Sequence, residues 1–358
     1  MRNFSKRPHD GLSVKQSTLP LNEFLDQSGV IIDVRSPGEF DQGHLPNAQN
    51  LPLFTNDERA IVGTLYKQVG HDEAYMEGLR IVGPKLAYLV ESAKKWTNGK
   101  LAKVHCWRGG MRSQALTQLL NWSGIRTITL EGGYKAYRNW ALKQTKSPRK
   151  IVILGGLTGS GKTHILHALK KKGEQILDLE DLACHKGSAY GRMYERKAPS
   201  NEQFENDLAW IYSQSNPNKT LWIEDESQRV GNCFIPHDLY QQMQNAPLIQ
   251  ICRPKEERIA LLKKDYSKHS KTPIIQATLR IQKRLGSERC KHLIQAIKED
   301  KASDAIILAL EYYDKSYQAS LKRRTNVQKS INAHGWNEDT WADALIEETK
   351  NKAATTFH

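Results

Sequence analysis

Cysteine is scarce and scattered in this chain of 358 residues, and long apolar runs are absent. The 5 cysteines lie far apart and none belongs to a Cys-x-x-Cys pair, which excludes a disulfide framework and a zinc-finger site. No stretch approaches the roughly 18 to 20 apolar residues that span a bilayer, so we expect no membrane association. The first residues, MRNFSKRPHD, have no apolar stretch behind their charges, and we therefore expect no secretory signal and a cytoplasmic location.

Positive charge is in excess along the chain. There are 53 Lys and Arg against 39 Asp and Glu, a formal net charge of +14, and residues 251–300 alone hold 13 basic and 6 acidic side chains. A polyanion is a natural partner for such a surface, because neutralising phosphates releases their counterions. A solvated lysine-rich surface explains the charge equally well.

The pattern of apolar residues predicts two α/β domains. Residues 11–142 alternate strand-like runs with amphipathic helices, which is typical of a parallel sheet. The polar segment 143–150, with a proline, predicts a linker, and a second domain over 151–325 opens on the apolar strand IVIL. Its later part is helix-rich, and residues 326–358 are expected to form a helical tail to which we assign no function.

A phosphate-binding loop follows that strand directly. In GGLTGSGKT, Gly156, Gly161, Lys162 and Thr163 satisfy the pattern GxxxxGK[ST], and Gly159 lies between them. Glycines let backbone N–H groups converge on a phosphate, the next helix directs its positive N-terminus at it, and the lysine adds a charge. The sequence predicts a phosphate or diphosphate site here, but the loop alone does not distinguish a nucleotide from a prenyl diphosphate.

A second strand, TLWIEDES at 220–227, ends in Glu224, Asp225 and Glu226. We predict that Asp225 assists phosphate binding, as acidic strand ends do in P-loop folds, although an ordinary strand running into an acidic loop would look the same. The Thr163 hydroxyl would let the loop use Mg²⁺ together with its ligand. We assign no resident metal site and expect no prosthetic group.

The second chemical motif is VHCWRGGMRSQAL. Cys106 follows a strand, two glycines permit a tight turn, and a helix begins near Ser113. Backbone N–H groups, the helix dipole and the charges of Arg108 and Arg112 favour the thiolate form of Cys106, and they would hold an incoming oxyanion. A buried, inert thiol is the alternative, and the other four cysteines fit it better.

The segment DVRSPGEFDQGHLPNAQNLP, together with this cysteine loop, resembles the rhodanese-like domain, a fold that passes sulfur through a cysteine persulfide. Simple rhodaneses usually carry four residues between the cysteine and the arginine. Here Cys106 and Arg112 enclose five, which is the HCxxxxxR spacing of cysteine phosphatases. A wider loop admits a larger, tetrahedral anion.

A rhodanese-like domain joined to a P-loop domain resembles the bacterial tRNA 2-selenouridine synthases. The strings LEGGYKAYR, IEDESQRVG and YYDKSY add to the likeness, which covers about residues 11–325. The resemblance implies geranylation of wobble 2-thiouridine and then exchange of the modified sulfur for selenium. Selenophosphate and geranyl diphosphate would be the co-substrates.

The resemblance also implies roles for the two loops. Cys106 would take selenium from selenophosphate as a selenyl-cysteine, with Arg108 and Arg112 stabilising the departing anion. Lys162 and Thr163 would neutralise the diphosphate of the geranyl donor, although ATP would fit the same motif.

The substrate implied is the anticodon region of tRNA. The expected backbone contacts are basic residues in predicted helices, namely Lys263, Lys264, Lys283, Arg284 and Arg289. Tyr312, Tyr313 or Tyr317 would stack on an unpaired base, unless their helical spacing places them in the core. We expect a monomer that makes transient contact with a supplier of selenophosphate.

Three other functions account for some or all of these features. A cysteine phosphatase of rhodanese fold explains the cysteine loop but leaves the P-loop without a task. An ATP-dependent tRNA sulfurtransferase with a persulfide at Cys106 would use every feature. A non-catalytic RNA-binding adaptor needs only the positive charge.

Overall fold

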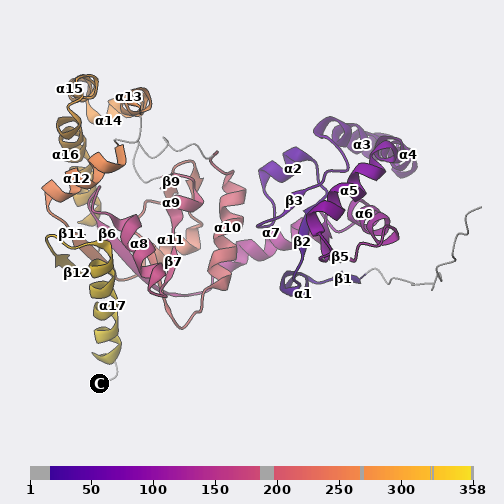
Figure 1. Ribbon diagram of the computed structural model, residues 1–358, viewed down its shortest axis with the longest axis horizontal. Coiled ribbons are helices and arrows are strands. Elements are labelled where there is room, and N and C mark those ends of the chain that lie inside the picture. Colours follow the sequence, from indigo (N-terminus) through magenta and orange to yellow (C-terminus); the bar gives the residue numbers. More distant parts are fainter. Residues whose placement is uncertain (1–16, 186–196, 267–269, 323, 325, 356–358) are drawn as a thin grey trace, which may run out of the picture. The chain divides into compact units, whose positions relative to one another are not determined.

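The computed structural model describes residues 17–185, 197–266, 270–322, 324 and 326–355. The chain divides into two compact units, residues 1–141 and 142–358 (Figure 1). Each unit contains a five-stranded parallel sheet with helices packed on it, which confirms the predicted α/β fold. Within the described ranges, no helix has the length and apolar character needed to cross a bilayer.

In the first unit the strand order is β1-β5-β4-β2-β3, and neighbouring strands are parallel. The strands are β1 (Ser17–Leu19), β2 (Val30–Asp33), β3 (Gln49–Asn50), β4 (Ala102–His105) and β5 (Thr127–Leu130). The helices are α1 (Leu21–Asp26), α2 (Pro37–Gln42), α3 (Asn56–Gln68), α4 (His71–Val82), the 3₁₀ turn η1 (Gly83–Lys85), α5 (Leu86–Thr97), α6 (Met111–Trp122) and α7 (Gly133–Gln144). Every residue of β4 and β5 is buried, as expected for strands covered on both faces.

The carboxyl ends of the two central strands carry the polar residues of this unit. Asp33 ends β2, His105 ends β4, and the parallel register places the two side by side. The chain leaves β4 at Cys106 and enters α6 five residues later. Ligand sites in open parallel sheets lie at this edge, so the fold brings the predicted cysteine loop to the expected position.

The second unit has the strand order β12-β11-β6-β8-β7, again with parallel pairs. Its strands are β6 (Lys150–Gly156), β7 (Gln175–Leu177), β8 (Thr220–Glu224), β11 (Leu248–Cys252) and β12 (Val327–Asn332), and a separate antiparallel pair is formed by β9 (Arg229–Val230) and β10 (Cys233–Phe234). The helices are α8 (Lys162–Lys171), α9 (Leu179–Leu182), α10 (Asn201–Gln214), α11 (His237–Asn245), α12 (Lys255–Tyr266), α13 (Lys271–Arg280), α14 (Gln282–Leu285), α15 (Ser287–Lys298), α16 (Ala302–Leu321) and α17 (Glu338–Thr355).

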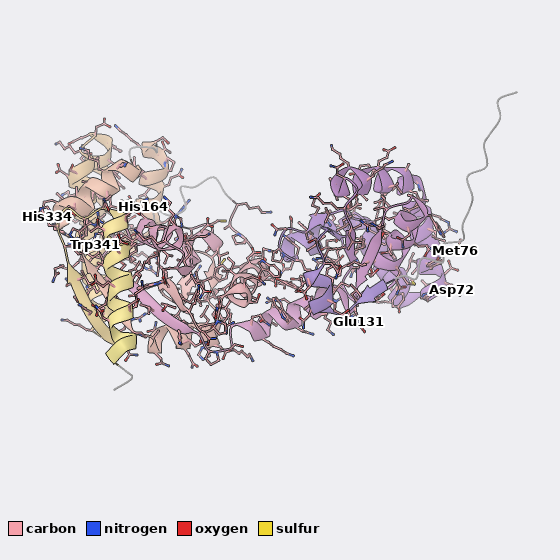
Figure 2. All side chains as sticks on the ribbon, turned by 60° about the horizontal axis from the view of Figure 1, so that its bottom comes forward. Asp72, Met76, Glu131, His164, His334 and Trp341 are labelled. Atoms are coloured by element: carbon pink, nitrogen blue, oxygen red, sulfur yellow. The ribbon has the colours of Figure 1, made fainter. Side chains whose placement is uncertain are left out.

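Alternation along β6 supplies the core on both faces of this sheet. Ile151 and Ile153 pack in one cluster with residues of α10 and α11, whereas Val152 and Leu154 pack in another with residues of α8 and α17. Successive side chains of a strand point to opposite faces, so an unbroken apolar run predicts burial on both. Trp341 of α17, labelled in Figure 2, is fully buried in the second cluster.

The expectation of a helical tail over residues 326–358 is wrong for its first part. Residues 327–332 form strand β12, which pairs in parallel with β11 and is the edge strand of the sheet. The segment VQKSIN is short and largely polar, so it lacks the apolar run that indicates a strand. Pairing with β12 satisfies backbone N–H and C=O groups of β11, which would otherwise be the open edge of the sheet. The second part is helical, as expected, and α17 packs against α8.

The helices after β11 form the helix-rich part that the sequence predicts. Helices α13, α14, α15 and α16 share a small core of their own, built around Leu285, Leu293 and Ile297. Helix α12 joins this group to the sheet, because it packs on α16 and follows directly from β11.

Candidate functional site

The first turn of α7 holds the cysteine loop in place. The backbone N–H of Tyr134 donates to the Cys106 carbonyl at 2.8 Å, and a Cβ on Gly133 would lie 2.4 Å from the same oxygen. Only glycine fits there, which gives a physical reason for the LEGGY string. The Cys106 Sγ is buried and lies 3.3 Å from Ser113 Oγ, whose hydroxyl donates to Gly110 O at 3.0 Å. The first turn of α6 therefore positions the sulfur.

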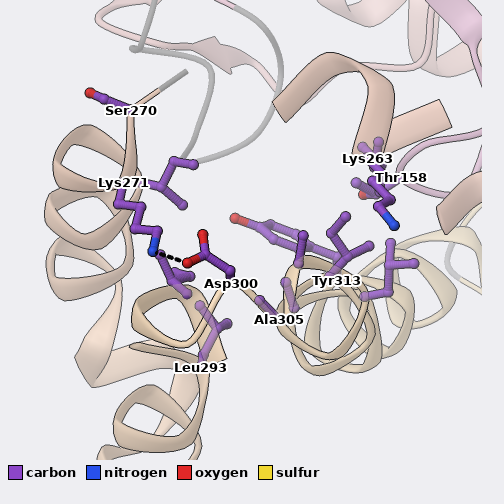
Figure 3. Close-up of a pocket in the computed structure, with 15 residues that line it drawn as sticks. Thr158, Lys263, Ser270, Lys271, Leu293, Asp300, Ala305 and Tyr313 are labelled. Carbon is purple, nitrogen blue, oxygen red and sulfur yellow. Dashed lines mark hydrogen bonds and ion pairs between the residues drawn. The ribbon is translucent and has the colours of Figure 1, made fainter. Parts of the chain in front are cut away.

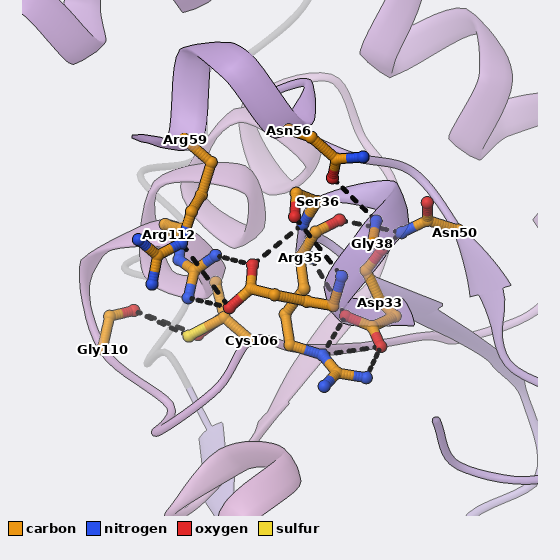
Figure 4. A network of polar contacts seen from close by, with 12 residues as sticks. Asp33, Arg35, Ser36, Gly38, Asn50, Asn56, Arg59, Cys106, Gly110 and Arg112 are labelled. Carbon is orange, nitrogen blue, oxygen red and sulfur yellow. Dashed lines mark hydrogen bonds and ion pairs between the residues drawn. The ribbon is translucent and has the colours of Figure 1, made fainter. Parts of the chain in front are cut away.

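A buried ionic network underlies the loop (Figure 4). Arg35 donates to both carboxylate oxygens of Asp33, at 3.0 and 2.6 Å, and its guanidinium lies 3.9 Å from the centre of the Tyr134 ring. His105 Nε2 lies 3.7 Å from Asp33. Burial opposes ionisation of Asp33, but the nearby His105 and Arg35 outweigh it and hold the pKa below its usual value. Burial also lowers the pKa of His105. This network fixes the strand ends from which the loop emerges.

Arg112 already has an anionic partner. Its Nη1 donates to Glu39 Oε2 at 2.8 Å, and Arg59 approaches the same carboxylate at 3.9 Å. Burial opposes the charge of Glu39, but the hydrogen bond and charge of Arg112 prevail and lower its pKa. The side chain of Arg108, by contrast, is exposed on the loop. An anion entering the loop would therefore compete with Glu39 for Arg112, and Arg108 would meet it from the solvent side.

The P-loop lies between β6 and α8, as the sequence predicts. Gly156, Gly159 and Gly161 have φ angles of 157°, 78° and 82°, backbone conformations that other residues rarely adopt. Lys162 Nζ donates to Gly156 O at 3.0 Å, and the Thr163 hydroxyl donates to Glu180 at 3.3 Å. The predicted phosphate-binding residues are thus gathered in one loop, with the lysine folded over it.

Three carboxylates lie beside the P-loop threonine. Ligand oxygens of Glu180, Glu224 and Glu226 all lie within 4.8 Å of one another. Burial, and then repulsion by neighbouring carboxylates, raises the pKa of each to about 8, although Lys162 opposes the shift. Glu224 Oε1 is buried and has no hydrogen-bond partner among the described residues. Clustered acidic oxygens with an unsatisfied lone pair suit a hard divalent cation such as Mg²⁺.

Asp225, which we predicted to assist phosphate binding, points elsewhere. It forms an ion pair with Arg324 and accepts a hydrogen bond from the Tyr317 hydroxyl at 3.1 Å. Tyr317 in turn accepts the backbone N–H of Gly156 at 2.8 Å, and burial, followed by the charge of Asp225, raises its pKa. Asp225 therefore supports the P-loop from behind, and its two neighbours Glu224 and Glu226 occupy the position facing Thr163.

One buried cation at the P-loop was not predicted. Arg253 follows β11, the strand next to β6, and its Nη2 lies 3.9 Å from the position that a Cβ on Gly161 would take. Its side chain is 5% exposed, and its Nε lies 4.0 Å from Glu257. Neither Nε nor Nη2 has a hydrogen-bond partner among the described residues. Its position in the sequence, directly after an apolar strand, could have indicated this placement. The carboxyl ends of parallel strands lie at one edge of the sheet, and the P-loop follows the carboxyl end of β6.

The predicted RNA contacts are distributed over three helices. Lys263 and Lys264 lie on α12, Lys283 and Arg284 on α14, and Arg289 on α15. All are exposed except Arg289, which is half-buried and lies 3.9 Å from Glu311. They share the helix-rich part of the second unit, and their role in binding tRNA stays a prediction.

The three tyrosines of α16 differ in their surroundings. Tyr312 packs on the helical core and makes an edge contact with Tyr313, with ring centres 5.3 Å apart. Tyr317 holds the P-loop. The expectation that one of the three stacks on a base receives no support from these packed positions.

Comparison with known proteins gives a consistent result for both units. Residues 149–346 match the family model described as the tRNA 2-selenouridine synthase AAA domain, and residues 20–139 match the rhodanese-like domain. The chain is 35% identical over 333 residues to a tRNA 2-selenouridine synthase of Sulfurovum sp. (strain NBC37-1), covering 83% of this chain and 90% of that protein. It is 34% identical over 355 residues to that of Hydrogenovibrio crunogenus, covering 89% and 95%.

Proposed function

This chain belongs to the tRNA 2-selenouridine synthase family, and we propose from that premise that it converts wobble 2-thiouridine of tRNA to 2-selenouridine in two steps. Geranyl diphosphate first alkylates the sulfur, and selenium from selenophosphate then replaces the geranylated sulfur. The observation that carries the proposal is that one chain holds two built anion sites, the cysteine loop and the P-loop. The two steps need two different phosphorus-containing donors, and each donor has a site that suits it.

The P-loop suits the diphosphate of the first step. The bond between C1 of the geranyl group and oxygen breaks, the thiouridine sulfur forms the new carbon–sulfur bond, and the base loses its N3 proton. Diphosphate leaves with the electron pair, so its oxygens gain charge as the bond breaks. Lys162 and the loop amides stabilise that charge, and Arg253 reaches it from the neighbouring strand.

A divalent cation fits the acidic residues beside the loop. Glu180, Glu224 and Glu226 with the Thr163 hydroxyl would hold Mg²⁺, and the buried oxygen of Glu224 without a partner is the observation that supports it. When bound, the cation supplies charge neutralisation to the diphosphate. The tyrosine and aspartate behind the loop keep the glycines in place.

The cysteine loop suits selenophosphate in the second step. Its five intervening residues leave room for a tetrahedral anion, Arg112 and Arg108 supply charge, and the Cys106 sulfur lies at the base. Selenium delivered from this loop would add to C2 of the geranylated base, and the geranyl thiol would depart. Alkylation makes the sulfur a better leaving group than the thiocarbonyl it replaces.

Two routes of attack by Cys106 satisfy the electron balance. If the thiolate attacks selenium, a selenyl-cysteine forms and the selenium–phosphorus bond breaks. The bonding electrons stay on phosphorus, which departs as phosphite, and a thiol reductant must later free the selenium. Attack on phosphorus forms phosphocysteine and releases selenide, and water then regenerates the thiolate as phosphate leaves. Phosphorus NMR of the products therefore reports which atom Cys106 attacks.

Membership of the family supports a tRNA substrate. The excess of basic side chains in residues 251–300 supports phosphate contacts by Lys263, Lys264, Lys283, Arg284 and Arg289. We propose that the protein works in the cytoplasm, where tRNA is available, as a monomer that receives selenophosphate from a transiently bound supplier.

The first step can be tested alone. Incubation of the protein with thiolated tRNA and geranyl diphosphate should yield S-geranyl nucleoside by mass spectrometry, and Lys162→Ala should reduce the rate by about 100-fold or more. The matched control is Lys170→Ala, an exposed lysine at the other end of the same helix. Thiolation of unmodified tRNA with ATP and sulfide, and no geranyl transfer, would overturn the proposal in favour of a sulfurtransferase. Hydrolysis of simple phosphoesters alone would favour a phosphatase.

A further inference from the structure

A cavity of about 340 Å³ opens between the helices that lie between strands β11 and β12 in the chain (Figure 3). It is enclosed by α12, α13, α15 and α16, and its wall is mostly aliphatic. The apolar side chains that line it are Leu262, Ile274, Leu293, Ile297, Ala302, Ala305, Ile306, Ala309 and Leu310. Three of these are alanines on one face of α16, and their small size leaves the space open.

The cavity begins at the P-loop. Thr158, within the phosphate-binding segment, forms part of its wall, and Lys263 lies next to it (Figure 3). Helix α12 packs on the loop beside this wall, because a Cβ on Gly159 would lie only 2.8 Å from Leu262. Arg258 donates to the Thr158 carbonyl at 3.2 Å and so ties the same helix to the loop. Thr158 therefore belongs both to the predicted phosphate-binding segment and to the wall of the apolar cavity, so the two sites adjoin.

We propose that this cavity binds the ten-carbon chain of the prenyl diphosphate whose diphosphate lies on the P-loop; the inference rests on the proposed function. An apolar cavity of about 150 Å³ holds the six carbons of benzene, so ten carbons need roughly 250 Å³. The space available exceeds that requirement, and five carbons would leave much of it empty.

A solvent-exposed ion pair lies at the far end of the cavity. Lys271 Nζ donates to Asp300 at 2.5 Å and to the Lys298 carbonyl at 3.0 Å. Figure 3 shows this pair on the side opposite Thr158 and Lys263, with the Tyr313 ring between them. The volume favours a donor of ten carbons over one of fifteen, because fifteen carbons need roughly 375 Å³ by the same scaling, which exceeds the space available.

Donors of five, ten and fifteen carbons test the proposal. Burying a methylene is worth a factor of about four in affinity, so the unmodified protein should prefer geranyl to dimethylallyl diphosphate by a hundredfold or more in kcat/KM. Ala309→Phe fills the cavity and should lower kcat/KM for geranyl diphosphate by about 100-fold, while affinity for inorganic pyrophosphate stays unchanged. Ile306→Ala enlarges the cavity and should improve use of the fifteen-carbon donor about tenfold. Ala319→Phe, an exposed position on the same helix, is the matched control.

The outcomes separate this inference from the proposed function. In one outcome, the unmodified protein transfers geranyl and Lys162→Ala does not, but Ala309→Phe and Ile306→Ala show the same chain-length preference as Ala319→Phe. That outcome overturns the cavity inference alone. If no prenyl diphosphate is used at all, the proposed function fails and this inference fails with it. Pyrophosphate binding by Ala309→Phe reports that this variant is folded. Ile306→Ala tests the cavity from the other side, because it should improve use of a longer donor rather than impair use of geranyl diphosphate.

Discussion

Arg253 provides a test in which ligand binding and protein stability should change in opposite directions. Its guanidinium is 5% exposed, lies beside Gly161, and has two nitrogens without hydrogen-bond partners among the described residues. Its nearest carboxylate, Glu257, lies at 4.0 Å and makes no hydrogen bond to these nitrogens, so the buried charge is poorly compensated in the ligand-free protein. An apolar side chain of similar length relieves that cost. A hydrogen bond from a cation to a diphosphate is worth about 1.5 to 3 kcal/mol, or roughly 10- to 150-fold in affinity.

We therefore expect Arg253→Met to weaken pyrophosphate binding by about 10- to 150-fold and to leave the stability of the ligand-free protein unchanged or raise it by about 1 kcal/mol. Titration calorimetry measures the first quantity and urea unfolding the second. Arg258→Met is the control, because that arginine, five residues later in α12, is also buried but is paired with Asp314 at 2.6 and 2.8 Å. It should lose about 3 kcal/mol of stability. The reasoning fails if Arg253→Met is as destabilising as the control, or if pyrophosphate binds it as tightly as the unmodified protein.

Three further predictions concern residues that support the two loops. Glu39→Gln removes the anion paired with Arg112 and leaves this arginine available to a bound anion. Phosphate should therefore inhibit the selenium step with an inhibition constant several-fold lower than for the unmodified protein, and an unchanged constant would contradict this. Tyr317→Phe leaves the Gly156 N–H and Asp225 without the hydroxyl, and urea unfolding should show a loss of about 1 to 3 kcal/mol; stability equal to that of the unmodified protein would show that the contact is dispensable. Burial, with repulsion from Glu180, raises the pKa of Glu224 to about 8. The folded protein therefore holds a proton that the unfolded chain releases near pH 5, so the free energy of unfolding should fall as the pH rises from about 5 to 8 in metal-free buffer. Glu224→Gln should reduce that fall by about 1.4 kcal/mol per pH unit, and an unaltered slope would refute the assignment.

Local signals in the sequence predict both loops well. The glycines of GGLTGSGKT and the strand before them specify the P-loop, and the structure places its residues together. The cysteine loop is equally local, because strand, cysteine, glycines and helix follow one another directly. In both cases the chemistry depends on neighbours in the chain, so no long-range information was needed.

What the sequence could not show depends on contacts between distant segments. Glu180 joins Glu224 and Glu226 only because β7 and β8 are neighbours in the sheet. Arg253 meets the P-loop because β11 pairs with β6. Asp225 was expected at the phosphate, but Arg324, almost a hundred residues later, turns it away. Strand β12 is stabilised by its pairing with β11 rather than by its own composition.

The central claim is that two steps occur at two sites in one chain, and the nucleosides formed by Cys106→Ser test it most directly. The variant would be incubated with thiolated tRNA, geranyl diphosphate and selenophosphate, and its tRNA digested for mass spectrometry. We expect S-geranyl nucleoside to accumulate without any selenium-containing nucleoside. Formation of 2-selenouridine by this variant, at a rate near that of the unmodified protein, would contradict the account.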